Sequence, residues 1–516
     1  MDWFDDWALT LAVFTPLVGM AIILLIPRAE EAAIKVVALL TSLVTLAIGV
    51  GILVDFDFGN TAKMQFQVDK EWIPVINARY HLGIDGISLP LLILTMVIVP
   101  LCIIYSLDHF PEPHNPKAFL ALILLLEVGM IGTFVALDLV LFFIFFEVVL
   151  LPMFFMIGVW GGPNREYASI KFFLFTLFGS ALMLVSFLAL YFLSKRSTFD
   201  ISTLASFEGA GITRGTQVLL FAGLFLGFAI KVPMFPFHTW LPDAHTEAPT
   251  VGSVLLAAVL LKLGTYGFIR IALPILPEGA QVWAPWIGLL SVVGIIYGAL
   301  CCLAQRDMKR LIAFSSVAHM GFVMLGIATL TDFGVNAAVF GMVAHGLITG
   351  MLFFLAGSIQ HRYHTREMSR LGGLLVSAPK MGWILGFCAM ASLGLPGLAG
   401  FWGEFPAVLS AFEPSRLANG ILGNTDSTLW TFRTFMVVAA IGTVLAAGYL
   451  LWMYQRVGMG TPKPEFEDAH IHDVHRPEWV AWTPLLLGIV VFGLFPNLIF
   501  SITNDAASSI TRAFSG

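Results

Sequence analysis

The stretch LDLVLFFIFFEVVLLPMFFMIGVW, residues 137–160, is long and apolar enough to cross a lipid bilayer, yet it carries Glu147 near its middle. Three further charged residues, Lys231, Lys262 and Glu404, stand in the same way inside apolar stretches. A charged side chain at the bilayer centre costs roughly 2.5–3.5 kcal/mol on insertion scales. Several such residues in one chain therefore predict an ion or proton path.

The composition is that of a membrane protein. Of the 516 residues, 58% are hydrophobic and 12% are charged, whereas soluble domains carry roughly 25% charged residues. The mean hydropathy is +0.89. The net charge of −6 comes without a basic cluster, so no nucleic-acid partner is indicated.

The cysteines and the N-terminus exclude two further features. Cys102, Cys301, Cys302 and Cys388 lie in apolar stretches and form no CxxC, so neither an iron–sulfur site nor a disulfide framework is indicated. The start, MDWFDDWALT, is acidic and lacks the basic region of a cleaved signal peptide, so we expect the first span to be retained.

Apolar runs of about 20 residues predict an all-α polytopic membrane protein with about fourteen transmembrane helices. Their expected centres are residues 17, 44, 97, 126, 149, 180, 224, 262, 293, 319, 347, 395, 443 and 490. Loops after odd-numbered spans hold fifteen lysines and arginines, and the opposite side holds ten. Because cytoplasmic loops are enriched in these residues, we expect an inner-membrane protein with both termini on the non-cytoplasmic side.

The chain also predicts an internal repeat. Three N-terminal helices (1–116) precede two five-helix blocks (117–274 and 282–456), and a loop with the last helix follows (457–516). Because five is odd, consecutive blocks enter the membrane from opposite sides, which gives two inverted repeats. In each block the fourth helix is broken by proline and glycine, in KVPMFPFHTWLPDAH (231–245) and SLGLPGLAGFWGEF (392–405).

The two breaks are where water is expected. Proline removes a backbone donor and clashes one turn back, which frees carbonyls that side chains or water must satisfy. Pro233 and Pro236 follow Lys231 closely, and Pro396 and Gly397 lie two turns before Glu404. The simpler alternative, that both breaks are only kinks, leaves a buried charged residue beside each without an explanation.

Five long motifs of the chain resemble those of a known family. They are LDLVLFFIFFEVVLLPMFFMIG (137–158), KVPMFPFHTWLPDAHTEAPT (231–250), QRDMKRLIAFSSVAHMGFVMLG (305–326), HGLITGMLFFLAGSIQHRYHTREMSRLGGL (345–374) and LGLPGLAGFWGEF (393–405). In this order they closely resemble the antiporter-like membrane subunits of proton-pumping NADH–quinone oxidoreductase, respiratory complex I. The wider family includes Mrp-type cation/proton antiporter subunits and membrane hydrogenase subunits. The resemblance covers nearly the whole chain.

The resemblance implies roles for individual residues. It makes Glu147 and Lys231 an interacting pair, Lys262 the central relay and Glu404 the terminal carboxylate, at a position where the L-like and N-like relatives carry lysine. It makes two histidines links across the midplane, His319 and His345. The residues themselves agree, since burial favours a neutral lysine, a nearby carboxylate favours a charged one, and histidine titrates near neutral pH.

Two further histidines, at the first break, have other expected roles. His238, in PFHTWLPDAH, is expected to bridge the break to solvent. His245, with Asp243 and Glu247 beside it, is expected to hold the shape of the loop.

The resemblance also implies partners and cofactors. The partners would be other membrane subunits of complex I, the L-like and N-like antiporter subunits among them, together with the lipid bilayer and protons. The chain would be a non-redox subunit with no cofactor of its own. No GxGxxG follows a strand, so we expect neither NADH nor flavin to bind here.

Three alternatives stay open from the sequence. The first is a sodium or potassium/proton antiporter or membrane hydrogenase subunit. The second is a haem-bearing electron carrier with His319 and His345 as axial ligands. The third concerns the loop EFEDAHIHDVHR (465–476), where a solvated or subunit-contacting segment is favoured over a metal site; its candidate ligands are Asp468, His470, His472, Asp473 and His475.

Overall fold

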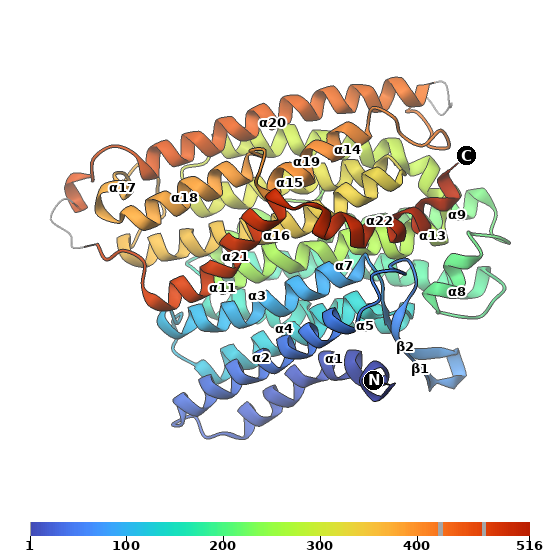
Figure 1. Ribbon diagram of the computed structural model, residues 1–516, viewed down its shortest axis with the longest axis horizontal. Helices are drawn as coiled ribbons and strands as arrows, with labels where there is room; N and C mark the ends of the chain where they lie inside the picture. The colour runs from blue at the N-terminus through green and yellow to red at the C-terminus, as the bar shows by residue number, and fades with distance from the viewer. Residues whose placement is uncertain (1, 422–426, 467–470, 516) are drawn as a thin grey trace.

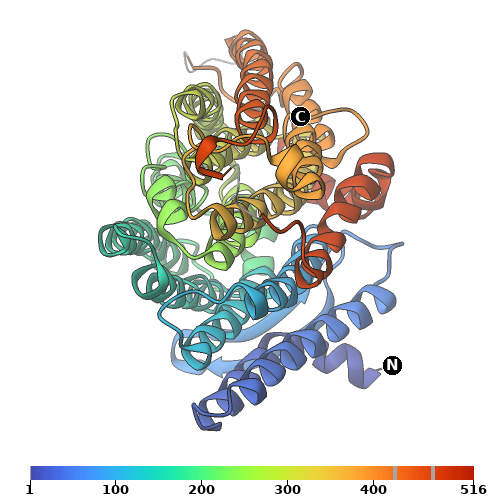
Figure 2. The same cartoon turned by 90° about the vertical axis from the view of Figure 1, so that its left-hand side faces the viewer.

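The computed structural model describes residues 2–421, 427–466 and 471–515. Long helices run side by side along one direction and form an elongated bundle, and both chain ends lie at the same end of it (Figure 1). Seen along the helices, the N-terminal helices form one edge and the middle of the chain fills the centre (Figure 2).

The first half of the chain contains the first thirteen α-helices and the only β-hairpin of the described residues. The helices are α1 (Asp2–Leu25), α2 (Glu31–Asp55), α3 (Ser88–Asp108), α4 (Pro116–Val135), α5 (Leu139–Val148), α6 (Leu150–Trp160), α7 (Arg165–Leu193), α8 (Ile201–Ser206), α9 (Arg214–Lys231), α10 (Trp240–Glu247), α11 (Thr250–Leu255), α12 (Leu261–Gly267) and α13 (Leu273–Ile275). Two π-helical segments, η2 (Leu256–Leu260) and η3 (Phe268–Ala272), join α11, α12 and α13 into one continuous rod.

The second half contains nine α-helices. They are α14 (Pro277–Leu303), α15 (Met308–Ala328), α16 (Asp332–Tyr363), α17 (Leu374–Ser377), α18 (Pro379–Ser392), α19 (Ala399–Ser410), α20 (Thr428–Gly458), α21 (Arg476–Leu494) and α22 (Asn497–Thr511). Short 3-10 turns are η1 (Pro74–Ile76), η5 (Pro464–Phe466) and η6 (Arg512–Phe514).

The prediction of an all-helical, polytopic membrane protein is confirmed. Thirteen helices among the described residues are long and apolar enough to cross a membrane. The span expected around residue 395 is divided into α18 and α19, each too short to cross alone. The division falls where Gly394 and Gly397 adopt φ of 81° and 93°, a left-handed backbone that favours glycine.

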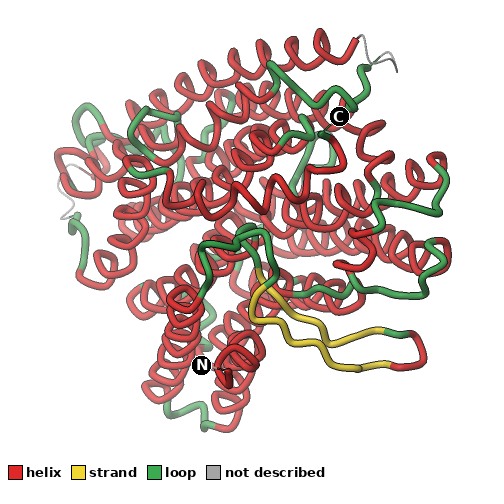
Figure 3. The backbone as a smooth tube through the Cα atoms, turned by 45° about the vertical axis from the view of Figure 1, so that its right-hand side comes forward, coloured by secondary structure: helices red, strands yellow, loops and turns green. Residues whose placement is uncertain are grey.

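Two elements were not expected from the sequence. The loop 55–84 folds into an antiparallel hairpin of β1 (Gln65–Ile73) and β2 (Ala78–Ile84), which projects from the helices (Figure 3). After the last predicted span, the chain forms α22, which packs against α16.

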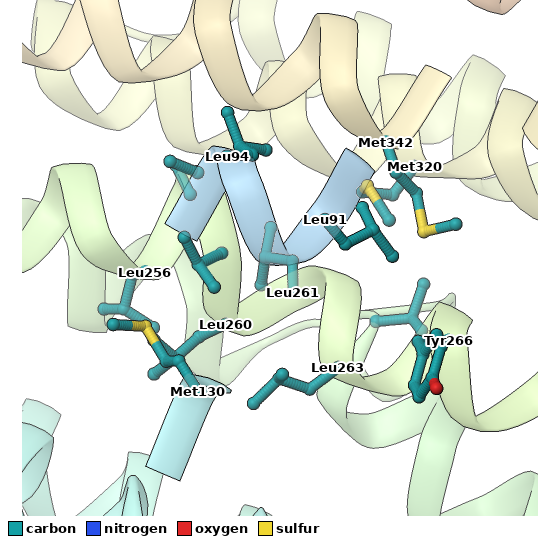
Figure 4. Packing of buried hydrophobic residues seen from close by; sticks show 14 of the residues in the cluster. Leu91, Leu94, Met130, Leu256, Leu260, Leu261, Leu263, Tyr266, Met320 and Met342 are labelled. Atoms are coloured by element: carbon teal, nitrogen blue, oxygen red, sulfur yellow. The ribbon is translucent and has the colours of Figure 1, made fainter. Parts of the chain in front are cut away.

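The rod of α11 to α13 lies at the centre of the bundle, where its most apolar stretch is entirely buried, as are those of α15 and α16. Leucines of this rod pack against methionines and leucines of the neighbouring helices in one apolar cluster (Figure 4). A charged side chain on these helices is therefore held away from lipid and inside protein.

Candidate functional site: a row of buried titratable residues

Lys231 is the last residue of α9, and the first break follows it from residue 232 to residue 239. The indole of Trp240 donates to the carbonyl of Ile230 at 2.9 Å, which satisfies one of the carbonyls that the helix end frees. The Lys231 side chain is buried, and its Nζ lies 4.7 Å from the centre of the Phe146 ring. This Nζ has no hydrogen-bond partner within the described part of the chain.

Glu147 follows Phe146 near the end of α5 and is half-buried. The charges of Glu147 and Lys231 act on each other, but among the described residues the two side chains form no direct ion pair. The structure therefore brings the expected pair into electrostatic range and leaves the lysine on an aromatic face.

Lys262 lies in α12, between the two π-helical segments, and is 0% exposed. A π turn is wider than an α turn and recurs at functional sites. The Lys262 Nζ donates back to the carbonyl of Ala257 inside η2, and it lies 2.7 Å from Nδ1 of His345. The wide turn thus holds the lysine head against a histidine of α16.

His345 and His319 continue the row from α16 to α15. Their ring centres are 6.0 Å apart. His319 Nδ1 lies 2.5 Å from Oε1 of Glu404, and its Nε2 lies 3.1 Å from Ser392 Oγ and 3.1 Å from the Tyr449 hydroxyl. The side chains of Lys262, His345, His319 and Glu404 therefore form one row through the protein interior.

A small cavity of about 20 Å³, enough for a water molecule, lies along this row. Its polar lining comes from His319, His345, Thr349, Ser392 and Glu404. The cavity lies beside the second break, which carries Ser392 on one side and Glu404 on the other. The break thus meets the row of titratable residues at a place where there is room between the side chains.

Glycines allow the close helix approach around Glu404. A Cβ at Gly403 would lie 2.5 Å from the Cα of Gly341, so α19 can approach α16 this closely only because Gly403 lacks a side chain. This contact fixes α19, and with it Glu404, against the helix that carries His345.

His238 is buried but lies apart from the row. Its ring stacks on Phe235 at 5.7 Å and meets Tyr297 edge-on at 5.0 Å. Its Nδ1 has no hydrogen-bond partner in the described residues.

His245 has surroundings that its expected role does not explain. Its ring is 0% exposed and stacks on Phe353 at 4.5 Å, yet neither ring nitrogen has a hydrogen-bond partner in the described structure. A histidine that holds a loop does so through hydrogen bonds. The charged neighbours of His245 are instead Lys309 and Lys262, and it in turn neighbours His345.

Lys309 was not singled out from the sequence. It is buried, and its Nζ donates to the carbonyl of Ala248. Lys309 also lines an open cavity of about 420 Å³ together with Glu247, His361 and His364. These residues belong to loops and helix ends that the positive-charge count assigns to the cytoplasmic side.

Three other residues were also missed. Ser392 and Tyr449 bond His319 from α18 and α20, and no local signal in the sequence marks them. Glu127 stands in the apolar run FLALILLLEVGM (119–130), which is the same signal that marks Glu147.

The segment 465–476 shows no metal grouping in its described part. Asp468 and His470 lie outside the described residues. Asp473 accepts hydrogen bonds from the backbone of Lys380 and Met381, and His475 caps the start of α21. These contacts tie the segment to neighbouring helices.

Comparison with known proteins agrees with this geometry. Residues 136–429 match the family described as NADH:quinone oxidoreductase/Mrp antiporter, transmembrane, and residues 11–133 match the NADH-ubiquinone oxidoreductase chain 4 amino terminus. The chain belongs to this family. NADH-quinone oxidoreductase subunit M of Rhodobacter capsulatus is 42% identical over 98% of this chain and 96% of its own length. NADH-ubiquinone oxidoreductase chain 4 of Arabidopsis thaliana is 38% identical, over 97% and 96%.

Solved structures of family members have the same fold. A chain of respiratory complex I from Thermus thermophilus superimposes with a TM-score of 0.85 at 29% identity, and covers 98% of this chain and 100% of that one. A chain of the Mrp complex from Dietzia is 20% identical with a TM-score of 0.81, over 99% of each chain, and shows the shared fold.

Proposed function

We propose that this chain is the subunit M-type, proton-translocating membrane subunit of an NADH–quinone oxidoreductase, and that it carries protons outward while quinone is reduced elsewhere in the complex. The relatives that match nearly its whole length carry the names subunit M and chain 4. The observation that carries the proposal is the buried row from Lys262 through His345 and His319 to Glu404.

Each neighbour in this row can pass a proton to the next. Lys262 donates a proton through its ammonium, His345 and His319 accept and donate on their two ring nitrogens, and Glu404 accepts on its carboxylate. The 2.7 Å and 2.5 Å contacts are hydrogen-bond distances. The rings of His345 and His319, whose centres are 6.0 Å apart, both line the small cavity, and a water there would bridge them.

The Glu147–Lys231 pair is the proposed switch. A carboxylate near a buried ammonium favours the charged lysine, and loss or protonation of the carboxylate favours the neutral one. A movement at the break after Lys231 would change the separation of Glu147 and Lys231, and with it their interaction. The pair can therefore set when Lys262 holds or loses its proton.

Proton uptake from the cytoplasm would pass through Lys309 and His245. The open cavity would give water access to Lys309. His245 neighbours both Lys309 and Lys262, and both of its ring nitrogens are free of protein partners in the described structure. His238 would bridge the first break to solvent.

The partners follow from the relatives. Other membrane subunits of the complex would flank this chain, the L-like and N-like antiporter subunits among them, and the chain would bind neither NADH nor flavin nor any cofactor of its own. Both termini are proposed to face the non-cytoplasmic side, and they lie at the same end of the bundle (Figure 1).

Two alternatives have direct tests. A sodium or potassium/proton antiporter would need the added cation for transport, which assays in defined salts reveal. A haem carrier would need free ring nitrogens, but both nitrogens of His319 already bond side chains, and a Soret band in the visible spectrum would be required.

The test is to remove the switch and to follow two activities separately. We expect Lys231→Ala and Glu147→Ala to assemble and to transfer electrons to artificial acceptors, while quinone-coupled turnover and proton pumping fall together. Assembly is checked first, because removing one partner of a buried charge pair can cost roughly 3–5 kcal/mol. Normal pumping by Lys231→Ala would refute the proposal.

A further inference from the structure

The open cavity beside Lys309 has a pair of histidines on its wall. His361, in the last turn of α16, is exposed, whereas His109, directly after α3, has a side chain that is 6% exposed. Their ring centres are 4.7 Å apart with the rings edge-on, and both residues line the cavity. One ring of the pair therefore reaches solvent, its neighbour is enclosed, and both meet the same open space as Lys309.

His109 is held in place from two sides. Its ring stacks on Tyr105 at 4.5 Å, and its Nε2 lies 3.4 Å from Oε1 of Glu478. The buried carboxylate of Glu478 also accepts two hydrogen bonds from the Arg362 guanidinium, at 2.8 Å and 2.7 Å. His109 thus gives His361 a fixed aromatic neighbour at the cavity wall.

The surroundings of His109 favour its neutral form. Burial lowers the pKa of His109, and the charges of His361 and Arg362 lower it further. The carboxylates of Glu478 and Asp108 act in the opposite direction without outweighing burial. A proton that arrives at the pair therefore resides on the exposed ring of His361.

The His361 ring is free to exchange protons with water. Within the described residues its nitrogens form no hydrogen bond or ion pair, and its ring contact is the one with His109. The other titratable or charged side chains on the cavity wall are Tyr105, Glu247, Lys309, His364 and Arg366. Histidine is the side-chain type that gains and loses a proton near neutral pH, so His361 suits the collection of protons at the cytoplasmic side.

Cavity water connects His361 to Lys309. The cavity has a volume of about 420 Å³, and each water in the liquid occupies roughly 30 Å³, so several waters fit in the space that both residues line. The Lys309 side chain is buried, and its Nζ donates to the carbonyl of Ala248. A proton that Lys309 passes inward to His245 must be replaced from this cavity.

We propose that His361 is the proton-loading residue of this cavity, with His109 as the positioning residue that holds its ring at the wall. A cytoplasmic buffer acid gives up a proton, and an N–H bond forms on the neutral His361 ring. That N–H bond then breaks, the proton passes along the cavity water, and an N–H bond forms on the neutral Lys309 amine. The ring ends neutral, as it began. The inference rests on the proposed function and adds the first residue to its path.

The test uses the purified complex in detergent, where no proton gradient builds up, and follows NADH–quinone turnover at alkaline pH in weak buffer. Protons are scarce under these conditions, so loss of the loading residue limits turnover. Imidazole, added at constant pH and ionic strength, supplies a free base that can enter the open cavity. His361→Gln removes the loading base, and His114→Gln, at an exposed histidine outside the cavity, is the matched control.

A positioned proton-transfer group contributes roughly 100-fold or more, and open water can replace part of this, so we expect the turnover of His361→Gln to fall by about tenfold. Imidazole should restore it, and vesicles should still show the wild-type number of protons pumped per NADH. His114→Gln should be unaffected. Wild-type turnover by His361→Gln in weak buffer, or a loss that imidazole does not restore, would overturn the loading role.

Two variants of His109 test its part. His109→Phe keeps an aromatic ring between Tyr105 and His361 and should retain most of the turnover, whereas His109→Ala removes the neighbour and should show an intermediate, imidazole-sensitive loss. A loss in His109→Phe as large as that in His361→Gln would contradict the assignment, because His109 would then carry the proton itself. Lys231→Ala separates the claims: if it stops pumping while His361→Gln behaves like wild type, only the loading role is lost.

Discussion

His319 lies 2.5 Å from Glu404 through one ring nitrogen and 3.1 Å from both Ser392 and Tyr449 through the other. The imidazole is therefore held from both sides by groups on three different helices, α18, α19 and α20. A ring fixed in this way presents one nitrogen to the terminal carboxylate, which favours transfer toward Glu404.

Tyr449→Phe removes one of the two hydrogen bonds at Nε2 of His319 and leaves the ring volume nearly unchanged. A hydrogen bond of this kind contributes roughly 0.5–1.5 kcal/mol, so we expect proton transfer at His319 to slow by up to about tenfold. Proton pumping by the reconstituted complex is the measurement. Tyr454→Phe, on the same helix, is the control, and equal pumping by the two variants would contradict the role of Tyr449.

His245→Phe tests proton uptake. The phenylalanine ring can keep the stacking on Phe353 but cannot carry a proton, so we expect assembly to persist and pumping to be lost. His114→Gln alters an exposed histidine outside the cavity of Lys309, in the loop before α4, and should pump normally. If His245→Phe pumps like wild type, protons reach Lys262 by another path.

Membrane orientation can be checked by cysteine labelling in intact cells. Asp332, the first residue of α16, and Glu367, in the loop that follows α16, are both exposed. A cysteine at Asp332 should react with an impermeant thiol reagent from outside, and one at Glu367 should not. Thr365 is a poorer position, since it is buried and would stay unlabelled on either side. The reverse pattern would invert the orientation of both repeats.

His81 and Asp200 connect the hairpin to the loop before α8, with Nδ1 and Oδ2 2.5 Å apart. Burial alone raises the pKa of Asp200, but hydrogen bonds from His81 and Thr203 outweigh it and hold the pKa below its ordinary value. A carboxyl group whose pKa is lowered in the folded protein stabilises the fold at every pH above its ordinary pKa. This stabilisation is lost as the pH falls through the lowered pKa.

We therefore expect Asp200→Asn to weaken this connection at neutral pH by roughly 1.5–3 kcal/mol, the usual range for hydrogen bonds to a charged group. Hydrogen exchange of the β2 amides in the assembled complex should become faster. Asp55→Asn, at an exposed aspartate, is the control. Unchanged exchange in Asp200→Asn would show that the pair does not hold the hairpin.

The membrane fold could be predicted from the sequence because the apolar spans and the two breaks are local signals. Lys262, His319, His345 and Glu404 were also predicted, and the structure places them in one row; their roles stay predictions. The π turns around Lys262 could not be predicted, since SVLLAAVLLKLGTYGFI (253–269) has the apolar pattern of an ordinary helix and the pattern does not reveal the hydrogen-bond register.

Other features depend on contacts between distant segments. His245 meets Phe353 across 108 residues and Tyr449 meets His319 across 130, and neither pair has a local signal. Glu127 is different, because its apolar surroundings in the sequence were as informative as those of Glu147. The hairpin was missed because its strands alternate polar and apolar residues only over short stretches.

The most direct test of the central claim is proton pumping by the Glu404→Gln complex, reconstituted in vesicles with quinone and NADH. Glutamine keeps the shape of the side chain but cannot titrate, so it should not pump, whereas Glu404→Asp should pump partially and Glu404→Lys should retain reduced activity, as the lysine-bearing relatives suggest. If Glu404→Gln pumps as well as wild type, Glu404 is a packing residue, protons leave by another path with His345 the next candidate, and the proposed row does not end at this carboxylate.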